Sequence, residues 1–411
     1  MQTKEKVLVL VSDSNGCYPV PASKGGAVTT LVESLIASNE KERLADFEIL
    51  TYWDKRAEEL STQYPNTRFR WVRIPRLVKT ADSLLFFIIL KFTNKKATSF
   101  LSLNALIWYI WKASRLLRKE HFDKVVLEHN ILQIWSLRLA NYKGKYYYHL
   151  HNIPRVNARS KEWFWRCDKL MCVSQYMVED IENEKSPIGP VPKGRGVALY
   201  NCIDTEQFRP LEKSTLKEWK IKYGILDEDK VLVYAGRMTW EKGIDKVLEA
   251  LDYIKTEQVK VLVVGALMMS NDHKDEYYDI LKALAQKHKG RVVFTGYVNH
   301  DELQYIYNIA DIAVLPSMWE EPAGLTMIEA MACGIPTITT RSGGIPEYVG
   351  DAAIVLERDE HLSKNIAKRV DMLFDDKPLY DEYSQKGCAR IRENFSLRDY
   401  LRKFVECIQM D

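Results

Sequence analysis

The stretch Trp319-Glu320-Glu321-Pro322-Ala323-Gly324-Leu325-Thr326-Met327-Ile328-Glu329-Ala330-Met331-Ala332-Cys333-Gly334-Ile335-Pro336 joins an apolar run to a segment with helical spacing. The preceding run, Ile312 to Leu315, is typical of a buried strand, and a Pro/Gly turn separates it from the helical pattern. Strand, loop and helix in this order indicate a parallel α/β sheet, which binds ligands at the carboxyl ends of its strands. We therefore expect Glu321 on the ligand-side loop and Glu329 about two turns inside the helix.

The start of this helix is a candidate anion site. Backbone N–H groups of Gly324, Leu325 and Thr326 would point out of the helix start, where the helix dipole is positive, and would suit a phosphate. The alternative is that Glu321 and Glu329 are simply solvated charges on a loop and a helix face.

Length and charge limit the class of protein. A chain of 411 residues exceeds what one hydrophobic core usually spans, so two domains of roughly 200 residues are expected. Its hydrophobic content of 46% is that of a folded globular chain. The net charge of +3 is too small to indicate nucleic-acid binding, and we expect no nucleic-acid partner.

Cysteine usage and apolar runs predict a cytoplasmic chain. The seven cysteines are scattered and form no Cys-x-x-Cys pair, which indicates neither a disulfide framework nor a zinc site. The first apolar run, Val7 to Val11, is too short for a signal peptide. The longest, Leu84 to Leu90, is far below the ~20 residues of a spanning helix.

A pair of glycines lies between the first strand and the first helix. Val7 to Val11 is followed by Gly25-Gly26 and then by the helical stretch Val28 to Ala37. Paired glycines let backbone approach a ligand and offer N–H groups at a helix start, although a flexible loop is the alternative. The first strand is not followed by Gly-x-Gly-x-x-Gly, which argues against a nicotinamide or flavin enzyme.

Two further strands of the first half end at polar residues. The run 124–127 ends at Glu128, and the run 145–150 ends at His151. Strand ends are where polar residues become functional in such sheets, although a single histidine there is more often structural. His149, two residues before His151 on the same strand face, is expected to be buried and satisfied.

Residues 68–96 combine basic and apolar side chains. The apolar run Leu84 to Leu90 is flanked by Arg68, Arg70, Arg73, Arg76, Lys79, Lys91, Lys95 and Lys96. This combination suits an anionic membrane surface. An ordinary core helix with solvated flanks is the alternative, and both interpretations stay open.

An arginine and a lysine follow a buried strand of the second half. The run Val231 to Gly236 precedes Arg237, and Lys242 lies five residues further on. Both side chains can reach a diphosphate, the arginine by its planar fork and the lysine as a point charge. A solvated surface is the alternative for these two charges.

Together these motifs resemble the signatures of family 4 retaining glycosyltransferases. They are Glu-Pro-Ala-Gly-x-x-x-x-Glu-Ala-Met-Ala-x-Gly-x-Pro from Glu321, Gly-Arg-x-x-x-x-Lys-Gly from Gly236, and Asn-x-x-Asp-x-x-x-Phe from Asn201. Signatures from Gly25 to Phe404 fall in the family's order, so the resemblance covers essentially the whole chain. It implies an α/β protein with the GT-B fold, in which two Rossmann-like domains face each other across a cleft.

The resemblance also implies the domain limits. Residues 1–209 would form an acceptor-binding domain and residues 210–390 a nucleotide-sugar-binding domain. Residues 391–411 would form a helix that crosses back to the first domain; the segment 396–408 has the apolar face of such a helix.

In the second half, the resemblance implies roles for six residues. Glu329 would hold the ribose hydroxyls and Glu321 the sugar hydroxyls of a nucleotide-sugar. Arg237 and Lys242 would bind its diphosphate. The pair Tyr297-Val298 follows the strand at which related enzymes hold the nucleobase by backbone groups.

In the first half, the resemblance places the Gly25-Gly26 amides on the diphosphate and His151 near the reacting carbon of the donor sugar. His129 and Glu128 would face the acceptor. One segment departs from the family pattern: Ala266-Leu267-Met268-Met269 is bulkier than the small or Gly-rich turn usual there, which bears on the nucleobase side.

The function implied is a retaining, metal-independent hexosyltransferase. It would move a sugar from a nucleotide-sugar, with a UDP-sugar favoured, to a saccharide or lipid-linked oligosaccharide acceptor in cell-surface polysaccharide or glycolipid assembly. The nucleotide-sugar is a co-substrate, and no separate cofactor is implied. The basic segment 68–96 would place the protein at the inner face of the cell membrane. A nucleotide-sugar epimerase or hydrolase and a non-catalytic nucleotide-sugar-binding subunit remain the alternatives.

Overall fold

The computed structural model of the chain describes residues 5–13, 15–93, 101–265 and 276–409. Lys95, Lys96 and the run Ala266 to Met269 lie outside these residues. The chain forms two compact units, the first of Met1–Asn201 with Leu397–Asp411 and the second of Cys202–Ser396. The limits 1–209, 210–390 and 391–411 stay a prediction of the domain boundaries.

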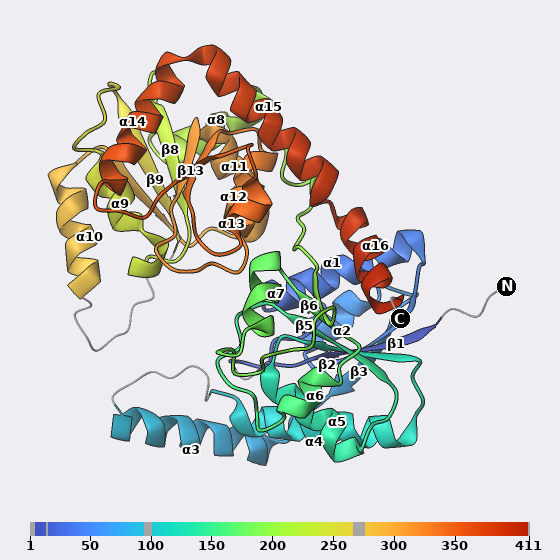
Figure 1. Cartoon of the computed structure of the whole chain (residues 1–411). Helices are drawn as coiled ribbons and strands as arrows, with labels where there is room; N and C mark the ends of the chain where they lie inside the picture. Colours follow the sequence, from blue (N-terminus) through green and yellow to red (C-terminus); the bar gives the residue numbers. More distant parts are fainter. Residues whose placement is uncertain (1–4, 14, 94–100, 266–275, 410–411) are drawn as a thin grey trace. The chain divides into compact units, whose positions relative to one another are not determined.

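The first unit contains a seven-stranded parallel sheet in the order β3-β2-β1-β4-β5-β6-β7 (Figure 1). Its strands are β1 (Lys6–Val11), β2 (Asp46–Tyr52), β3 (Arg68–Val72), β4 (Lys124–Glu128), β5 (Lys145–Leu150), β6 (Lys169–Cys172) and β7 (Gly196–Ala198). The central strand β1 is an almost continuous apolar run because both faces of the sheet are covered.

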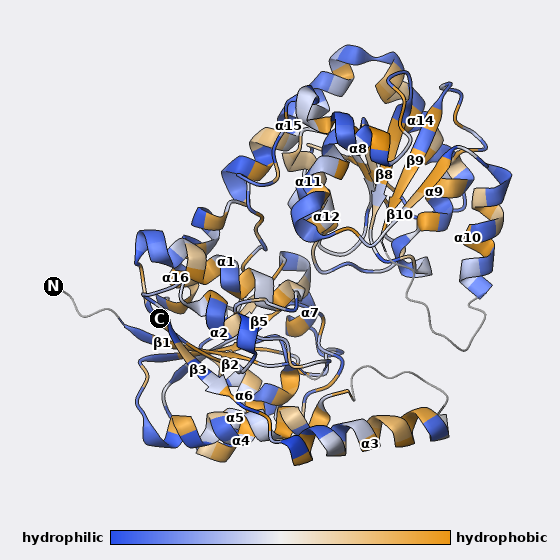
Figure 2. Ribbon diagram, turned by 180° about the vertical axis from the view of Figure 1, so that it is seen from behind, coloured by the Kyte–Doolittle hydropathy of each residue, from blue (hydrophilic) through white to orange (hydrophobic). Residues whose placement is uncertain are grey.

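The first unit also contains helices. They are α1 (Ala27–Glu42), α2 (Lys55–Ser61), α3 (Arg76–Thr93), α4 (Leu103–Lys119), η2 (Ile131–Gln133), α5 (Ile134–Ala140), α6 (Lys161–Trp165), α7 (Gln175–Glu182) and α16 (Leu397–Gln409). Figures 1 and 2 show α1, α7 and α16 on one face and α4, α5 and α6 on the other.

The register of β4 and β5 sets the first cluster of polar side chains. Glu128 at the end of β4 pairs with His149 of β5. His151 follows two residues later and therefore lies on the same side of the strand as His149. The sheet pattern alone thus brings Glu128, His149 and His151 together at the carboxyl ends of neighbouring strands.

The second unit contains a six-stranded parallel sheet in the order β10-β9-β8-β11-β12-β13. Its strands are β8 (Lys230–Ala235), β9 (Val259–Val264), β10 (Val292–Gly296), β11 (Ile312–Leu315), β12 (Thr337–Thr340) and β13 (Ile354–Leu356). Its helices are η3 (Lys213–Leu216), α8 (Lys217–Lys222), η4 (Trp240–Lys242), α9 (Ile244–Ala250), α10 (Glu276–Lys287), α11 (His300–Ile309), α12 (Leu325–Ala332), α13 (Ile345–Val349), α14 (Leu362–Asp375) and α15 (Lys377–Asn394).

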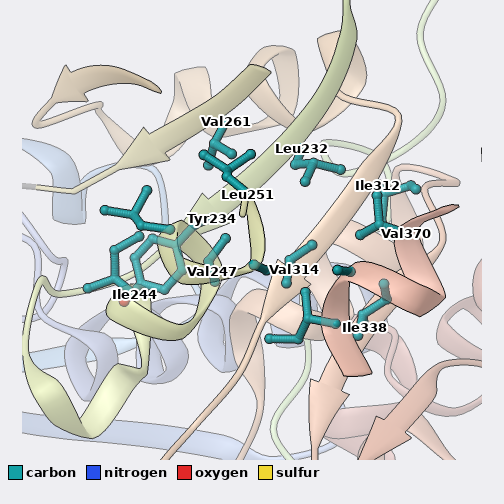
Figure 3. Close-up of a cluster of buried hydrophobic side chains, with 14 of the residues drawn as sticks. Leu232, Tyr234, Ile244, Val247, Leu251, Val261, Ile312, Val314, Ile338 and Val370 are labelled. Atoms are coloured by element: carbon teal, nitrogen blue, oxygen red, sulfur yellow. The ribbon is translucent and has the colours of Figure 1, made fainter. Parts of the chain in front are cut away.

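Buried aliphatic side chains fix the loops of this second sheet. Figure 3 shows Leu232 of β8, Val314 of β11 and Ile338 of β12 packed with Val247 of α9 and Val370 of α14. All of them are at most 1% exposed. The strands β8 and β11 are hydrogen-bonded neighbours, and the loops that follow them therefore begin from a tightly packed part of the sheet.

No helix among the described residues combines the length and the apolar character that crossing a membrane requires.

Candidate functional site

An ion pair joins the loops that follow β8 and β11. The Lys242 ammonium lies 2.8 and 2.6 Å from the two carboxylate oxygens of Glu321. The Trp319 indole N–H donates to the same carboxylate at 2.7 Å, and the Ser317 hydroxyl donates at 3.3 Å. Two residues 79 positions apart in sequence are thus held in one cluster of charge-assisted bonds.

The backbone around Glu321 depends on the neighbouring loop after β12. The Gly344 N–H donates to the Glu321 carbonyl at 2.8 Å, and the Glu321 N–H donates to the Ser342 hydroxyl at 3.2 Å. Gly343 has a φ of +49°, and a Cβ there would clash with the backbone of Glu321. Because only glycine fits this contact, Gly343 helps to position Glu321 and its carboxylate.

Arg237 lies on the same loop as Lys242 but is more open. Its side chain is 56% exposed, and one guanidinium nitrogen lies 3.8 Å from Glu241. The Met318 N–H donates to the Glu241 carbonyl at 2.8 Å, which ties this loop to the segment that leads to Glu321. The structure therefore brings Arg237, Lys242 and Glu321 to the carboxyl ends of two adjacent strands.

Glu329 lies inside α12, with its side chain only 7% exposed. The Tyr307 hydroxyl donates to one of its oxygens at 3.1 Å, and His300 Nε2 lies 3.1 Å from the other. The hydrogen bond to Glu329 raises the pKa of His300, although burial opposes this.

His300 and Tyr307 were not predicted as partners of Glu329. Both lie on α11, seven residues apart and hence on one helix face. That spacing, in a helix starting just after the nucleobase-side pair Tyr297-Val298, was the available signal.

Three predicted backbone contacts lie at the start of α12, and two follow β10. Gly324 precedes α12 as its N-cap, and Leu325 and Thr326 begin the helix. Tyr297 is 77% exposed, whereas Val298 is buried. The role of these five residues in binding stays a prediction.

In the first unit, Gly25 and Gly26 form the turn before α1. The Gly25 N–H donates to the Ala22 carbonyl at 2.9 Å, and the Thr29 hydroxyl donates to both glycine carbonyls. Gly26, with a φ of +103°, is the N-cap of α1. Because the Gly25 N–H is engaged in this turn, the turn must open before that amide can bind a diphosphate.

Glu128 lies beneath two imidazoles, with side-chain exposures of 1% for Glu128, 0% for His149 and 8% for His151. His149 Nδ1 lies 3.0 Å and His151 Nε2 lies 2.9 Å from the same carboxylate oxygen. Burial alone would raise the pKa of Glu128, but its two histidine partners lower it. His149 is buried as expected, but its Nε2 is without a hydrogen-bond partner among the described residues.

Neither of two groups of possible metal ligands needs an ion to explain it. Donor atoms of Glu128, His149 and His151 lie within 4.8 Å of one another, which their mutual hydrogen bonds account for. The chain also contains an Asp-x-Asp string at 227–229, before β8, and thus at the opposite end of that strand from Arg237. Its carboxylates are paired: Asp227 with Lys220 at 3.1 Å, and Asp229 with Lys260 at 2.7 Å.

Sequence comparison finds a family match in the second half of the chain. Residues 216–390 match the family model described as glycosyl transferases group 1. The chain is 26% identical over 292 residues to the lipopolysaccharide 1,2-N-acetylglucosaminetransferase of Salmonella typhimurium, covering 69% of this chain and 72% of that protein. It is 32% identical over 235 residues to the N-acetyl-alpha-D-glucosaminyl L-malate synthase of Bacillus anthracis, covering 53% and 57%.

Structural comparison covers the whole length. HepE from Anabaena, solved with UDP and glucose, superposes with a TM-score of 0.70 at 17% identity over 98% of both chains. A glycosyltransferase from Rickettsia africae gives 0.72 at 18% identity over 99% and 98%. These likenesses show the fold, and they confirm the predicted GT-B class.

Proposed function

We propose that the chain is a retaining hexosyltransferase of the glycosyl transferases group 1 family and that it uses a UDP-sugar. The match of residues 216–390 to that family's model and the GT-B fold of its units support this. The observation that carries the proposal is the cluster of Arg237, Lys242 and Glu321 at the ends of β8 and β11. It sets cations beside a carboxylate, as a donor with a charged diphosphate and a hydroxyl-rich sugar requires.

Each part of the donor has a matching group in the second unit. Arg237 and Lys242 supply positive charge for the diphosphate, joined by the N–H groups at the start of α12. Glu321 accepts from sugar hydroxyls. Glu329 accepts from the ribose hydroxyls, since each of its oxygens keeps a further lone pair beside its bond to Tyr307 or His300.

The proposed reaction breaks the bond between the sugar's anomeric carbon and the diphosphate oxygen. An acceptor hydroxyl forms the new bond from the same face, and its proton passes to an oxygen of the departing diphosphate. The diphosphate gains negative charge in the transition state, so the cations of Arg237 and Lys242 stabilise it more than the ground state. Because these cations take the place of a metal, the reaction is proposed to be metal-independent.

Known proteins support the donor class. Solved structures of HepE hold UDP, UDP-glucose, or UDP with glucose. One relative is a lipopolysaccharide N-acetylglucosaminetransferase. We therefore propose a saccharide or lipid-linked oligosaccharide acceptor, in cell-surface polysaccharide or glycolipid assembly.

We further propose that the protein works at the cytoplasmic face of the cell membrane, docked through α3. Leu77, Leu84 and Phe87 on this helix are 84%, 60% and 61% exposed. Figure 2 shows hydrophobic residues recurring along α3 between hydrophilic ones. Such a helix suits an anionic lipid surface, where apolar side chains enter and basic ones meet headgroups.

Product analysis tests the proposed reaction. The purified chain is incubated with UDP-glucose, UDP-galactose, UDP-N-acetylglucosamine or GDP-mannose and a saccharide acceptor, with and without EDTA, and the anomeric configuration of the product is read by proton NMR. A glycoside with the donor's configuration, formed equally in EDTA, is the expected result. An inverted product or a strict metal requirement overturns the mechanism. An isomerised or free sugar alone indicates an epimerase or hydrolase, and no turnover indicates a binding subunit.

A further inference from the structure

Two neighbouring histidines bond to one buried carboxylate through different ring nitrogens. His149 approaches Glu128 through Nδ1, and His151 approaches it through Nε2. An ionised carboxylate only accepts hydrogen bonds, so both of these nitrogens must carry a proton. A neutral His149 is thereby fixed as the Nδ1–H tautomer, and a neutral His151 as the Nε2–H tautomer.

The surroundings of the cluster favour an ionised Glu128 and a neutral His151. The two histidine partners lower the pKa of Glu128 and thus favour its ionised form. Burial lowers the pKa of His151 and thus favours its neutral form. A neutral imidazole protonated at Nε2 has a lone pair at Nδ1, which can only accept a hydrogen bond.

Side chains of α16 and the backbone of His129 both contact His149. Tyr400 and Phe404 of α16 lie with ring centroids 6.5 Å from that of His149 and help to bury it. His129 has a φ of +59°, and its N–H donates to the His149 carbonyl at 2.8 Å. Non-glycine residues rarely adopt the left-handed conformation, and those that do are often found at functional sites.

We propose that Glu128 is a positioning residue that fixes the His151 tautomer, so that His151 Nδ1 accepts a hydrogen bond from a substrate hydroxyl. The tautomer follows from this cluster alone, and the contact with a substrate rests on the proposed function. His151 is then a neutral acceptor that selects for a hydroxyl, and Glu128 acts only through it.

The first test reads the tautomers directly. Long-range proton–nitrogen NMR of the chain labelled with ¹⁵N-histidine distinguishes Nδ1–H from Nε2–H, and His149→Gln and His151→Gln assign the signals among eight histidines. His149 is expected in the Nδ1–H form and His151 in the Nε2–H form. His121, whose side chain is 90% exposed, is the internal reference for a solvated ring. His151 protonated at Nδ1, or averaging both tautomers, overturns the proposal, as does a stoichiometric metal ion in the cluster.

The second test separates tautomer from charge. Glu128→Met removes the acceptor, whereas Glu128→Gln removes the charge but keeps a carbonyl oxygen that can accept both bonds. With Glu128→Met we expect an averaged His151 signal and a kcat/KM on the order of 10²-fold lower, as when one aligned hydrogen bond to the reacting group is lost. Glu128→Gln is expected to keep the tautomers and most of the activity. Glu179→Gln, on the exposed face of α7, controls for loss of a carboxylate and is expected to match the wild type.

Equal kinetics of wild type and a folded Glu128→Met protein with averaged tautomers overturns the positioning role. Low activity in Glu128→Gln with intact tautomers overturns it too, because charge rather than tautomer would then matter. If Glu128→Met does not fold, the tautomers of the wild type and the activity of Glu128→Gln still test the proposal.

The third test identifies the hydroxyl's source. UDP-glucose alone or the saccharide acceptor alone is added to the labelled wild type. A shift of the His151 Nδ1 signal with one of them assigns the contact to the donor or to the acceptor, and no shift with either overturns the contact. A chain without transferase activity but with the expected tautomers would refute the proposed function and leave the tautomer assignment standing.

Discussion

We expect Arg237 and Lys242 to act on the departing diphosphate rather than on the stability of the fold. Arg237 is more than half exposed, so little packing is lost when it is shortened. We predict that Arg237→Ala or Lys242→Ala raises the barrier of transfer by ~2–4 kcal/mol, the typical cost of removing one electrostatic donor. Turnover and thermal unfolding are compared with Lys246→Ala, a control on α9 whose lysine pairs with Glu249. Wild-type turnover in a folded double variant would refute the role.

The pair between Lys242 and Glu321 has a second consequence at the residue scale. The carboxylate neutralises the lysine that the proposal assigns to the diphosphate, at 2.6 Å. We predict that Glu321→Gln binds UDP more tightly, by about 1 kcal/mol or roughly 5-fold, because the freed ammonium meets the diphosphate without first losing a partner. Sugar transfer should nonetheless fall, since the variant lacks the carboxylate proposed to accept hydrogen bonds from the sugar hydroxyls.

Calorimetric titration with UDP measures this effect. Glu357→Gln is the matched control, because Glu357 pairs with Arg341 at 2.7 Å on an exposed surface. Unchanged or weaker UDP binding by Glu321→Gln would mean that the ion pair does not compete with the nucleotide.

His300 gives the second unit a predicted pH dependence. Its hydrogen bond to Glu329 raises the pKa of His300 above the usual 6.5. The folded chain therefore holds the proton more tightly than the unfolded chain, so this pair stabilises the fold below about pH 6.5 and the effect disappears as pH rises through the raised value. We expect at most about 1 kcal/mol, because the side chain of His300 is half exposed.

Unfolding of His300→Gln and wild type at pH 5.5, 7 and 9 measures the difference in stability, with the exposed His361→Gln as control. The gap between wild type and His300→Gln should be largest at pH 5.5. A gap that grows toward pH 9 would give the pair the opposite sign.

At the scale of elements, the strands were predictable because their apolar runs are long and buried on both sides. The runs 124–127, 145–150 and 312–315 end where the structure ends β4, β5 and β11, or one residue earlier. The partners of Glu329 were not predictable in the same way. Its bonds come from α11, and which face of α11 meets α12 is settled by tertiary packing rather than by local sequence.

Helix α16 shows how a remote element completes a sheet face. Phe404 is fully buried, and its ring packs edge-on against that of Phe47 of β2 at 6.0 Å. We predict that Phe404→Ala lowers the free energy of unfolding of the first unit by about 3–5 kcal/mol, through lost burial and the cavity left behind. Chemical denaturation checks this, with the exposed Glu406→Ala on the same helix as control. A change below 1 kcal/mol would mean that α16 contributes little to the stability of this unit.

At the scale of the whole molecule, the chain enters and leaves the second unit at neighbouring points. Ile203 forms a parallel bridge with Ser396, and its N–H donates to the Phe395 carbonyl at 3.0 Å. Composition could not show this, since the two segments are far apart in sequence. The resemblance implies domain limits at 209/210 and 390/391, which stay a prediction, whereas the compact units divide between Asn201 and Cys202 and between Ser396 and Leu397.

Docking through α3 would determine where the whole molecule works in the cell. Arg73, Arg76, Lys79 and Lys91 are exposed on or beside α3, next to its exposed apolar residues. Each basic side chain near an anionic surface contributes ~1 kcal/mol, so four would hold the chain reversibly and salt would release it. We predict flotation with phosphatidylglycerol-containing liposomes at low salt and its loss at high salt.

Two variants and one control separate the forces in this docking. Changing the four basic residues to Gln should abolish flotation, whereas Leu84→Ser with Phe87→Ser should weaken it at every salt concentration, because burial of apolar area is not screened. The control changes four exposed lysines of the second unit, Lys217, Lys255, Lys289 and Lys368, to Gln. It removes the same charge, so only a loss specific to α3 supports docking through that helix. Equal recovery of all proteins in the lipid fraction, or of none, would mean that α3 is an ordinary solvated helix and would refute docking through it.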